Sequence, residues 1–203
     1  NCKVVFNGDG ADEVCMGYVY NQNAPSDEEF YYENIRLLRE IHYFDVLRSD
    51  RSISSNGLEP RTPFLDKDFV EYYMNIEPEH KRFGKNNKPE KYLLRKAFEE
   101  SGLLPDEVLW RHKCAFSDGV SSIENSWHKT LKQFVDSQLS DEEFELIKKN
   151  TEHCKPILKE SAFYRKIYES YYGEHVALIP HFWMPRWTNV TDPSARELSN
   201  YKE

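Results

Sequence analysis

Acidic side chains gather directly after a short apolar run near the start of the chain. The β-branched and aromatic residues 4–6 lead into the turn Asn-Gly-Asp-Gly at 7–10, and Asp12 and Glu13 come next. Such a run indicates a strand whose end presents backbone N–H groups and carboxylates at the edge of a parallel sheet. Carboxylates there suit a divalent cation or a proton transfer beside a phosphate, because glycine lets the main chain approach a ligand closely. A tight turn capped by an aspartate explains the same residues, so both interpretations stay open at this point.

The composition limits the class of protein. The 203 residues fit one large domain or two small ones, and the 39% of hydrophobic residues are enough for a buried core. The net charge of −8 provides no basic field for a phosphate backbone, so we expect no nucleic-acid partner. The sequence shows no signal peptide and no apolar stretch of about 18 residues, the length of a membrane span. The four cysteines form no C-x-x-C pair, which argues against zinc and favours reduced thiols in a cytoplasmic protein.

The elements that must position the acidic turn are mostly helical. Apolar residues recur every three or four positions between 28 and 48 and predict one long helix. Its apolar stripe consists of Tyr31, Ile35, Leu38, Ile41 and Phe44. A short helix is expected at 63–75 and another at 89–101, each opened by a proline, with a polar, basic loop at 79–88 between them.

Further helices are predicted in the second half of the chain. Two capping boxes mark their starts, Ser121 with Glu124 and Ser140 with Glu143. The segment 160–172 predicts an amphipathic helix whose aromatic stripe packs in the core, and a loop is expected from Gly173 onward. The only strand predicted is 4–6. Because one strand cannot form a sheet, its neighbours are expected outside these 203 residues.

Ordered segments along nearly the whole chain resemble the glutamine-hydrolysing asparagine synthetases. Residues 7–13, Asn-Gly-Asp-Gly-Ala-Asp-Glu, are similar to the family's Ser-Gly-Glu-Gly-(Ala/Ser)-Asp-Glu. The other matching segments are 45–51, 57–66, 90–95, 110–113, 116–119, 181–187 and 191–196. The last two segments are most similar to the eukaryotic branch of the family.

The resemblance implies an α/β parent fold with a parallel sheet, like that of the adenine nucleotide alpha hydrolases. Residues 1–203 then form the C-terminal portion of the ATP-dependent, amide-forming domain, mostly α-helical with one N-terminal strand. The family's pyrophosphate loop, of the type Ser-Gly-Gly-x-Asp-Ser, and the N-terminal nucleophilic cysteine of its glutaminase domain do not occur in this sequence. We therefore expect both in a missing N-terminal part of the same protein, and we expect this piece alone to be inactive.

The activity that the resemblance implies is a ligase reaction that converts aspartate into asparagine. ATP and Mg²⁺ turn the side-chain carboxylate of aspartate into a β-aspartyl-adenylate, and ammonia from glutamine then attacks the acyl group. Members of the family often form homodimers. Two alternatives stay open: a non-catalytic remnant that acts as an interaction module, and a related amide synthetase such as a β-lactam synthetase.

The site residues are carried over by position. Asn7 and Gly8 fall where the family contacts the nucleotide, largely through the backbone. Asp9 falls at the catalytic glutamate, Asp12 at a Mg²⁺ ligand, and Lys91 at a lysine that holds the pyrophosphate. The plainer alternatives are a helix-dipole carboxylate for Asp12 and a solvated ammonium for Lys91.

Two positions depart from the family pattern. Asp9 is one methylene shorter than glutamate, which sets its carboxylate back by roughly 1.5 Å, and misplacement of that order can cost about a hundredfold in rate. The Gly-Gly expected after Glu13 is here replaced by Met16 and Gly17.

Other charged residues of the matching segments are expected to lie around the site. Glu59, Arg61 and Asp66 are predicted to form a buried ion-pair scaffold behind it. Arg111 and Lys113 either face the triphosphate or lie at the surface.

Overall fold

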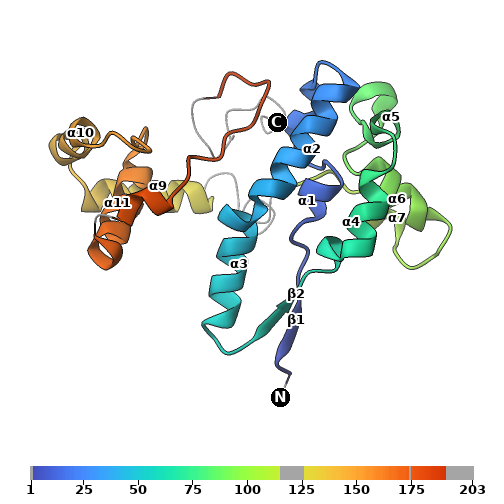
Figure 1. The fold of residues 1–203 in the computed structure, drawn as a ribbon, viewed down its shortest axis with the longest axis horizontal. Coiled ribbons are helices and arrows are strands. Elements are labelled where there is room, and N and C mark those ends of the chain that lie inside the picture. The colour runs from blue at the N-terminus through green and yellow to red at the C-terminus, as the bar shows by residue number, and fades with distance from the viewer. Residues whose placement is uncertain (1, 115–125, 174, 191–203) are drawn as a thin grey trace. The chain divides into compact units, whose positions relative to one another are not determined.

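The computed structural model describes residues 2–114, 126–173 and 175–190. These residues form two compact units. The first unit contains residues up to 112 together with 185–189, and the second contains the described part of 113–184. Figure 1 shows the strands and the helices α1 to α7 of the first unit in blue to green.

A two-stranded parallel sheet lies in the first unit (Figure 1). β1 (Val4–Phe6) pairs with β2 (Glu59–Arg61). The ladder continues past β1, because the Asn7 N–H donates to the Arg61 carbonyl at 3.0 Å. The prediction that every neighbour of the first strand lies outside the chain was therefore wrong. Pro60 concealed the second strand, since proline lacks an N–H and argues against a strand in a sequence.

Three helices follow β1 along the chain. The short α1 (Ala11–Val14) leads to α2 (Asp27–Glu40), and α3 (Asp45–Ser54) follows after one 3₁₀ turn. The single helix predicted over 28–48 is therefore two helices. They separate because Phe44 leaves the helical region, with φ −123° and ψ −109°.

The buried face of α2 differs from the predicted stripe. Its buried residues are Phe30, Glu33, Asn34 and Leu37. The predicted stripe is half-buried or, at Tyr31, exposed. The fully buried Glu33 carboxylate accepts hydrogen bonds from Tyr20 at 2.6 Å and from Arg36 at 2.6 and 2.8 Å, and Arg186 lies 3.1 Å from it. Two cations and a hydroxyl offset the free-energy cost of burying this charge.

Further helices of the first unit come from the middle of the chain. They are α4 (Lys67–Met74), α5 (Pro78–Lys81), α6 (Tyr92–Glu99) and α7 (Asp106–Leu109). The loop predicted at 79–88 was wrong for its first residues, 79–81, which form the end of α5. Lys81 in that helix is only 1% exposed. The helix predicted from residue 89 begins at Tyr92, because Lys91 takes a left-handed conformation with φ 54° just before it.

The core of the first unit forms around α1. In Figure 1 this helix lies beside α2 and α4, and both contact it. Val14 and Cys15 of α1 are fully buried and pack with Tyr73 of α4. Partly buried hydrophobic residues surround them: Leu38, Leu65, Phe69, Val70, Ile76, Leu93 and Leu94. The position of α1 is thus set by packing on several sides.

The second unit is built from α9 (Trp127–Gln138), α10 (Asp141–Asn150) and α11 (Lys159–Tyr172). The α11 bounds confirm the helix predicted at 160–172. The cap predicted at Ser140 is also confirmed, because its Oγ accepts a hydrogen bond from the Glu143 N–H at 3.1 Å. The capping box predicted at Ser121 and Glu124, together with the matching segments 116–119 and 191–196, lies outside the described residues.

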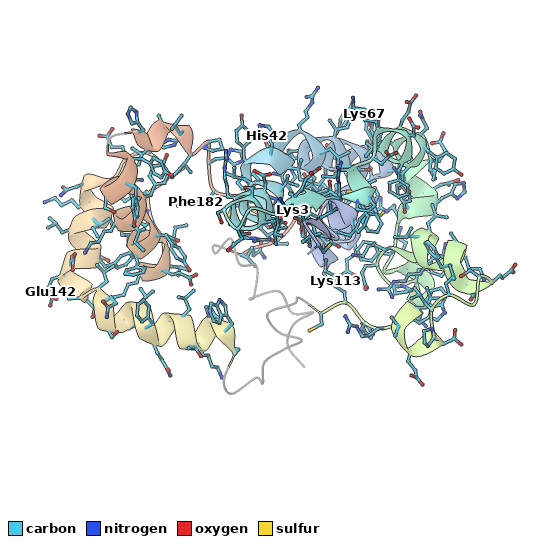
Figure 2. All side chains as sticks on the ribbon, turned by 90° about the horizontal axis from the view of Figure 1, so that it is seen from below. Lys3, His42, Lys67, Lys113, Glu142 and Phe182 are labelled. Carbon is cyan, nitrogen blue, oxygen red and sulfur yellow. The ribbon has the colours of Figure 1, made fainter. Side chains whose placement is uncertain are left out.

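The aromatic stripe of α11 is only partly buried. Phe163 meets Phe134 of α9 edge-on, with ring centroids 5.7 Å apart. Tyr164 and Tyr171 are 49% and 79% exposed, so the prediction that the stripe packs in the core was wrong for these residues. Figure 2 shows the side chains of this unit, with Glu142 labelled on α10. Within the described ranges, no helix is long and apolar enough to cross a lipid bilayer.

Candidate functional site

The turn between β1 and α1 is held by hydrogen bonds of its first residue. The Asn7 side chain donates to Ser49 Oγ on α3 at 2.8 Å and accepts from the Asp9 N–H at 3.1 Å. Gly10 has a left-handed φ of 88°, and a Cβ on it would overlap the Leu65 side chain. The turn therefore requires glycine at its last position.

Lys91 reaches Asp12 from a distant part of the sequence. Its Nζ donates to Asp12 Oδ1 at 2.7 Å, and the two side chains are 21% and 29% exposed. Gly17 makes room for this pair, because a Cβ there would overlap Asp12 Oδ1 and lie 2.9 Å from Cγ and Cδ of Lys91. Met16 takes φ 54°, a region that favours glycine, so the backbone keeps a glycine-like shape at the departure from the family's Gly-Gly.

Asp9 presents a buried carboxylate oxygen. Its Oδ2 has no hydrogen-bond partner in the described protein. Leaving a buried acceptor unpaired costs about 1–3 kcal/mol, so such an oxygen suits contact with a bound ion, ligand or water. Gly8 beside it is exposed, with nothing within 4 Å of the place where a Cβ would stand. Open backbone next to an unpaired carboxylate oxygen suits a phosphate and its cation.

The predicted site residues come from two parts of the first unit. Asn7, Gly8, Asp9 and Asp12 follow one another in the turn and in α1, and Lys91 stands at the N-cap of α6. The structure joins Lys91 directly to Asp12. In the described part of the chain, Lys91 forms no direct bond with Asp9.

The donor set fits a magnesium ion held together with a substrate, and it does not fit a metal held by protein alone. Among the described residues, no group of three or more His, Cys, Asp or Glu side chains could hold a metal ion. Mg²⁺ is usually bound by one or two carboxylates while phosphates and waters complete its shell. Asp12, with the unpaired oxygen of Asp9 close by in sequence, supplies carboxylates of that kind.

The predicted buried scaffold is not present. Arg61 and Glu59 form an ion pair at 2.5 Å, but their side chains are 57% and 58% exposed. Asp66 instead caps α4, where its Oδ1 accepts from the N–H groups of Asp68 and Phe69 at 3.1 and 3.2 Å. The prediction failed because β2 lies at the surface of the described structure, where a charged pair keeps its hydration.

Tyr18, which no sequence pattern indicated, links α1 to α3. The Tyr18 Oη lies 2.6 Å from Glu13 Oε1 and 2.9 Å from Asp45 Oδ2. One hydroxyl proton cannot serve two carboxylates, so the second contact needs a proton on a carboxyl group. Burial raises the pKa of the Glu13 carboxyl to about 7, whereas Asp45 is partly exposed and pairs with Arg48 at 2.6 Å. Glu13 is therefore the group that carries the extra proton near neutral pH.

Two further buried polar residues contact the region behind α1. Asn34 of α2 donates through Nδ2 to the Glu13 carbonyl at 2.6 Å and to the Val14 carbonyl at 3.3 Å. Lys81 of α5 lies 3.4 Å from the other end of the same amide. Neither residue carries a local signal in the sequence, because Asn34 sits inside an apolar helix pattern and Lys81 in a basic segment.

Comparison with known proteins matches the chain to one family. The family model described as asparagine synthase matches residues 21–195. The asparagine synthetases (glutamine-hydrolysing) of Gallus gallus and Cricetulus griseus are 48% identical to the chain over 199 residues, and that of Homo sapiens is 47% identical. The matched stretch covers 98% of this chain but 35% of each relative. The chain thus spans about a third of the length of these curated relatives.

Proposed function

Because the chain belongs to the asparagine synthase family, we propose that it forms one wall of the ATP-dependent site of a ligase that converts aspartate into asparagine. The parent fold would be the α/β fold of the adenine nucleotide alpha hydrolases, to which the β1–β2 pair contributes two parallel strands. The names of the relatives support aspartate as the acyl substrate and do not favour a β-lactam synthetase or a non-catalytic remnant.

The observations that carry this proposal are the contact of Lys91 with Asp12 and the unpaired, buried oxygen of Asp9 three residues before Asp12. The ammonium is a compact charge with three donors, which suits the oxygens of a departing pyrophosphate. Asp12 and Asp9 are acidic, so they suit the cation that accompanies a triphosphate. When a phosphate and its cation bind together, two new contacts would replace the Lys91–Asp12 ion pair. Lys91 would contact the phosphate, and Asp12 would contact the cation.

The proposed reaction has two steps. A carboxylate oxygen of aspartate attacks the α-phosphorus of ATP, the bond to the bridging oxygen breaks, and pyrophosphate leaves. The nitrogen of ammonia then attacks the activated acyl carbon, AMP leaves, and the nitrogen loses a proton to give asparagine. The first step gives the carboxylate a good leaving group, without which ammonia cannot displace an oxygen.

The residues of this chain have separate tasks in the proposed site. Lys91 holds and stabilises the negative charge that develops on the pyrophosphate. Asn7 and Gly8 bind the nucleotide through open backbone, and Asp9 orients the reacting groups and takes up the ammonia proton. Asp12 holds Mg²⁺, which would lower the repulsion between the attacking carboxylate and the phosphates.

The remaining parts of the activity lie outside what the chain contains. A pyrophosphate loop and a glutaminase domain that releases ammonia from glutamine would come from further segments of the same protein. We also propose a cytoplasmic enzyme that can form a homodimer.

Pyrophosphate release by the complete gene product tests this proposal. We expect release that depends on aspartate, ATP and Mg²⁺ together, and asparagine as the product when glutamine or ammonia is added. A protein that releases pyrophosphate with another carboxylic acid, and none with aspartate, would show that the acyl substrate is wrong. No release with any amino acid would support the non-catalytic alternative.

A further inference from the structure

The buried side chain of Lys81 has no task in the reaction proposed above. Its Nζ lies 3.4 Å from Asn34 Oδ1 and 3.4 Å from the Tyr73 carbonyl, and it stands 5.7 Å from the centroid of the Tyr73 ring. Within the described ranges of the chain, Lys81 forms no ion pair with a carboxylate. Burial also lowers its pKa to about 8.

Such a lysine costs stability. An ammonium taken out of water loses its hydration, and two long hydrogen bonds and one ring contact return only part of that free energy. A methionine of similar length would fill the same space without this cost. Stability of the fold therefore does not explain why a lysine stands at position 81.

The contacts of Asn34 show what the lysine can do. The Asn34 amide is fully buried and has one acceptor end and one donor end. Lys81 can only donate, so it turns the Oδ1 end toward itself and leaves the Nδ2 end toward α1. That end donates to the carbonyls of Glu13 and Val14, at the end of α1 where helix carbonyls lack partners within the helix. A flipped amide would press its oxygen against both carbonyls.

We propose that Lys81 is a positioning residue for the ATP-dependent site, which acts by orienting the Asn34 amide that holds the end of α1. α1 carries Asp12, so the same amide fixes where Asp12 stands in front of Lys91. The inference deepens the proposed function and rests on it for the role of Asp12. The link from Lys81 to α1 itself does not depend on any substrate.

Hydrogen exchange of α1 in Lys81→Met tests the link without substrates. The Val14 and Cys15 amides donate to carbonyls at the start of α1, at 2.8 and 3.1 Å, and report on its local opening. We expect their exchange to speed up by at least roughly tenfold while the global Tm stays equal or rises, because the buried charge is gone. Lys81→Arg should restore slow exchange, because it keeps a donor. Lys85→Met, the same change at an exposed lysine nearby, should change neither quantity.

A second variant covers the case in which Lys81→Met does not fold. Asn34→Asp has the same shape and keeps an acceptor for Lys81, but it removes both donors to α1. It should also speed exchange at Val14 and Cys15. If the Val14 and Cys15 amides of a folded variant exchange at the wild-type rate, the positioning role is overturned. Faster exchange spread over all amides, with a lower Tm, overturns it as well.

The rate of pyrophosphate release gives the functional half of the test, measured on the complete gene product. We expect kcat of Lys81→Met to fall by roughly tenfold to a hundredfold, as for a small misplacement of a reacting group. KM for aspartate should stay close to that of the wild type. If the wild type releases no aspartate-dependent pyrophosphate, the proposed function fails, and the exchange data still decide the link from Lys81 to α1. If the wild type is active and Lys81→Met keeps its full kcat, the inference fails alone.

Discussion

Lys91 Nζ lies 2.7 Å from Asp12 Oδ1, although 79 positions separate the two residues in the sequence. The helix that begins after Lys91 and the helix that contains Asp12 pack into one core, so this meeting follows from the fold of the first unit. A partly exposed ion pair of this kind contributes about 0–1 kcal/mol to stability. The Lys91–Asp12 ion pair therefore matters for ligand binding more than for stability.

Replacing Lys91 should affect activity far more than stability. We expect Lys91→Met to lower aspartate-dependent pyrophosphate release by roughly a hundredfold or more, since a charged donor to the leaving group is lost. The free energy of unfolding should change by about 1 kcal/mol or less. Lys96→Met is the matched control, because Lys96 lies on α6, the helix that Lys91 precedes, and forms an ion pair with Glu99 at the surface. Equal activity in both variants would remove Lys91 from the site.

Gly17 should not tolerate a methyl group. A Cβ there lies 2.9 Å from Cγ and Cδ of Lys91 and overlaps Asp12 Oδ1, so Gly17→Ala must push the ion pair apart. We expect a loss of about 1–3 kcal/mol in urea unfolding and a slower reaction. Gly8→Ala meets nothing within 4 Å and should leave stability within about 0.5 kcal/mol, while KM for ATP rises. Two variants with the same stability would contradict the crowding at Gly17.

Asp9 should be necessary even though it is shorter than the family's glutamate. Asp9→Asn keeps the shape but removes the charge, and we expect pyrophosphate release to fall roughly a hundredfold. Asp9→Glu should give no large gain, because the turn is built around the shorter side chain, whose neighbours Asn7 and Gly10 are fixed. A gain of about a hundredfold would show instead that this site is impaired, as expected for a misplaced carboxylate.

Stability of the unliganded protein should fall as the pH rises toward neutral. The Glu13 carboxyl has a pKa of about 7 in the folded protein because it is buried, and about 4.3 in an unfolded chain. Between these values the folded state binds more protons than the unfolded state, so the free energy of unfolding decreases with pH and levels off above pH 7. The difference between these two pKa values corresponds to about 4 kcal/mol.

Unfolding in urea at pH 5 and at pH 8 measures this dependence. Glu13→Gln should make the free energy of unfolding nearly independent of pH. At pH 8 this variant should be more stable than the wild type, because it buries no charge. Glu28→Gln, at an exposed position of α2, should leave the pH dependence unchanged. Parallel curves for the wild type and Glu13→Gln would mean that Glu13 ionises normally in the folded protein.

Local patterns predicted the acidic turn but missed its neighbours. The apolar run before Asn7 and the glycines after it are signals within a few residues, and the strand and the turn stand where they indicated. The second strand has no such signal, since Pro60 interrupts it, and it exists only because β1 supplies the other side of the ladder. On α2 the hydrophobic pattern favoured the wrong face, because Glu33 and Asn34 are buried by partners far away in sequence.

The candidate site shows the same division. Resemblance to a family selected Asp12 and Lys91, and the fold brings them together. Tyr18, Asn34 and Lys81 were missed because their roles depend on a proton, an amide orientation and a buried environment. None of these properties can be seen in residue type or spacing.

The ion pair of Arg186 with Glu33 has a consequence for folding during synthesis. The Arg186 guanidinium lies 3.1 Å from the buried carboxylate of Glu33. Glu33 belongs to α2, which leaves the ribosome long before Arg186 does. Synthesis proceeds from the N-terminus, so the unit that carries the acidic turn cannot reach its final form until the segment 113–184 has also been translated. During that interval, among the described residues, Arg36 is the cation that pairs with the buried carboxylate of Glu33.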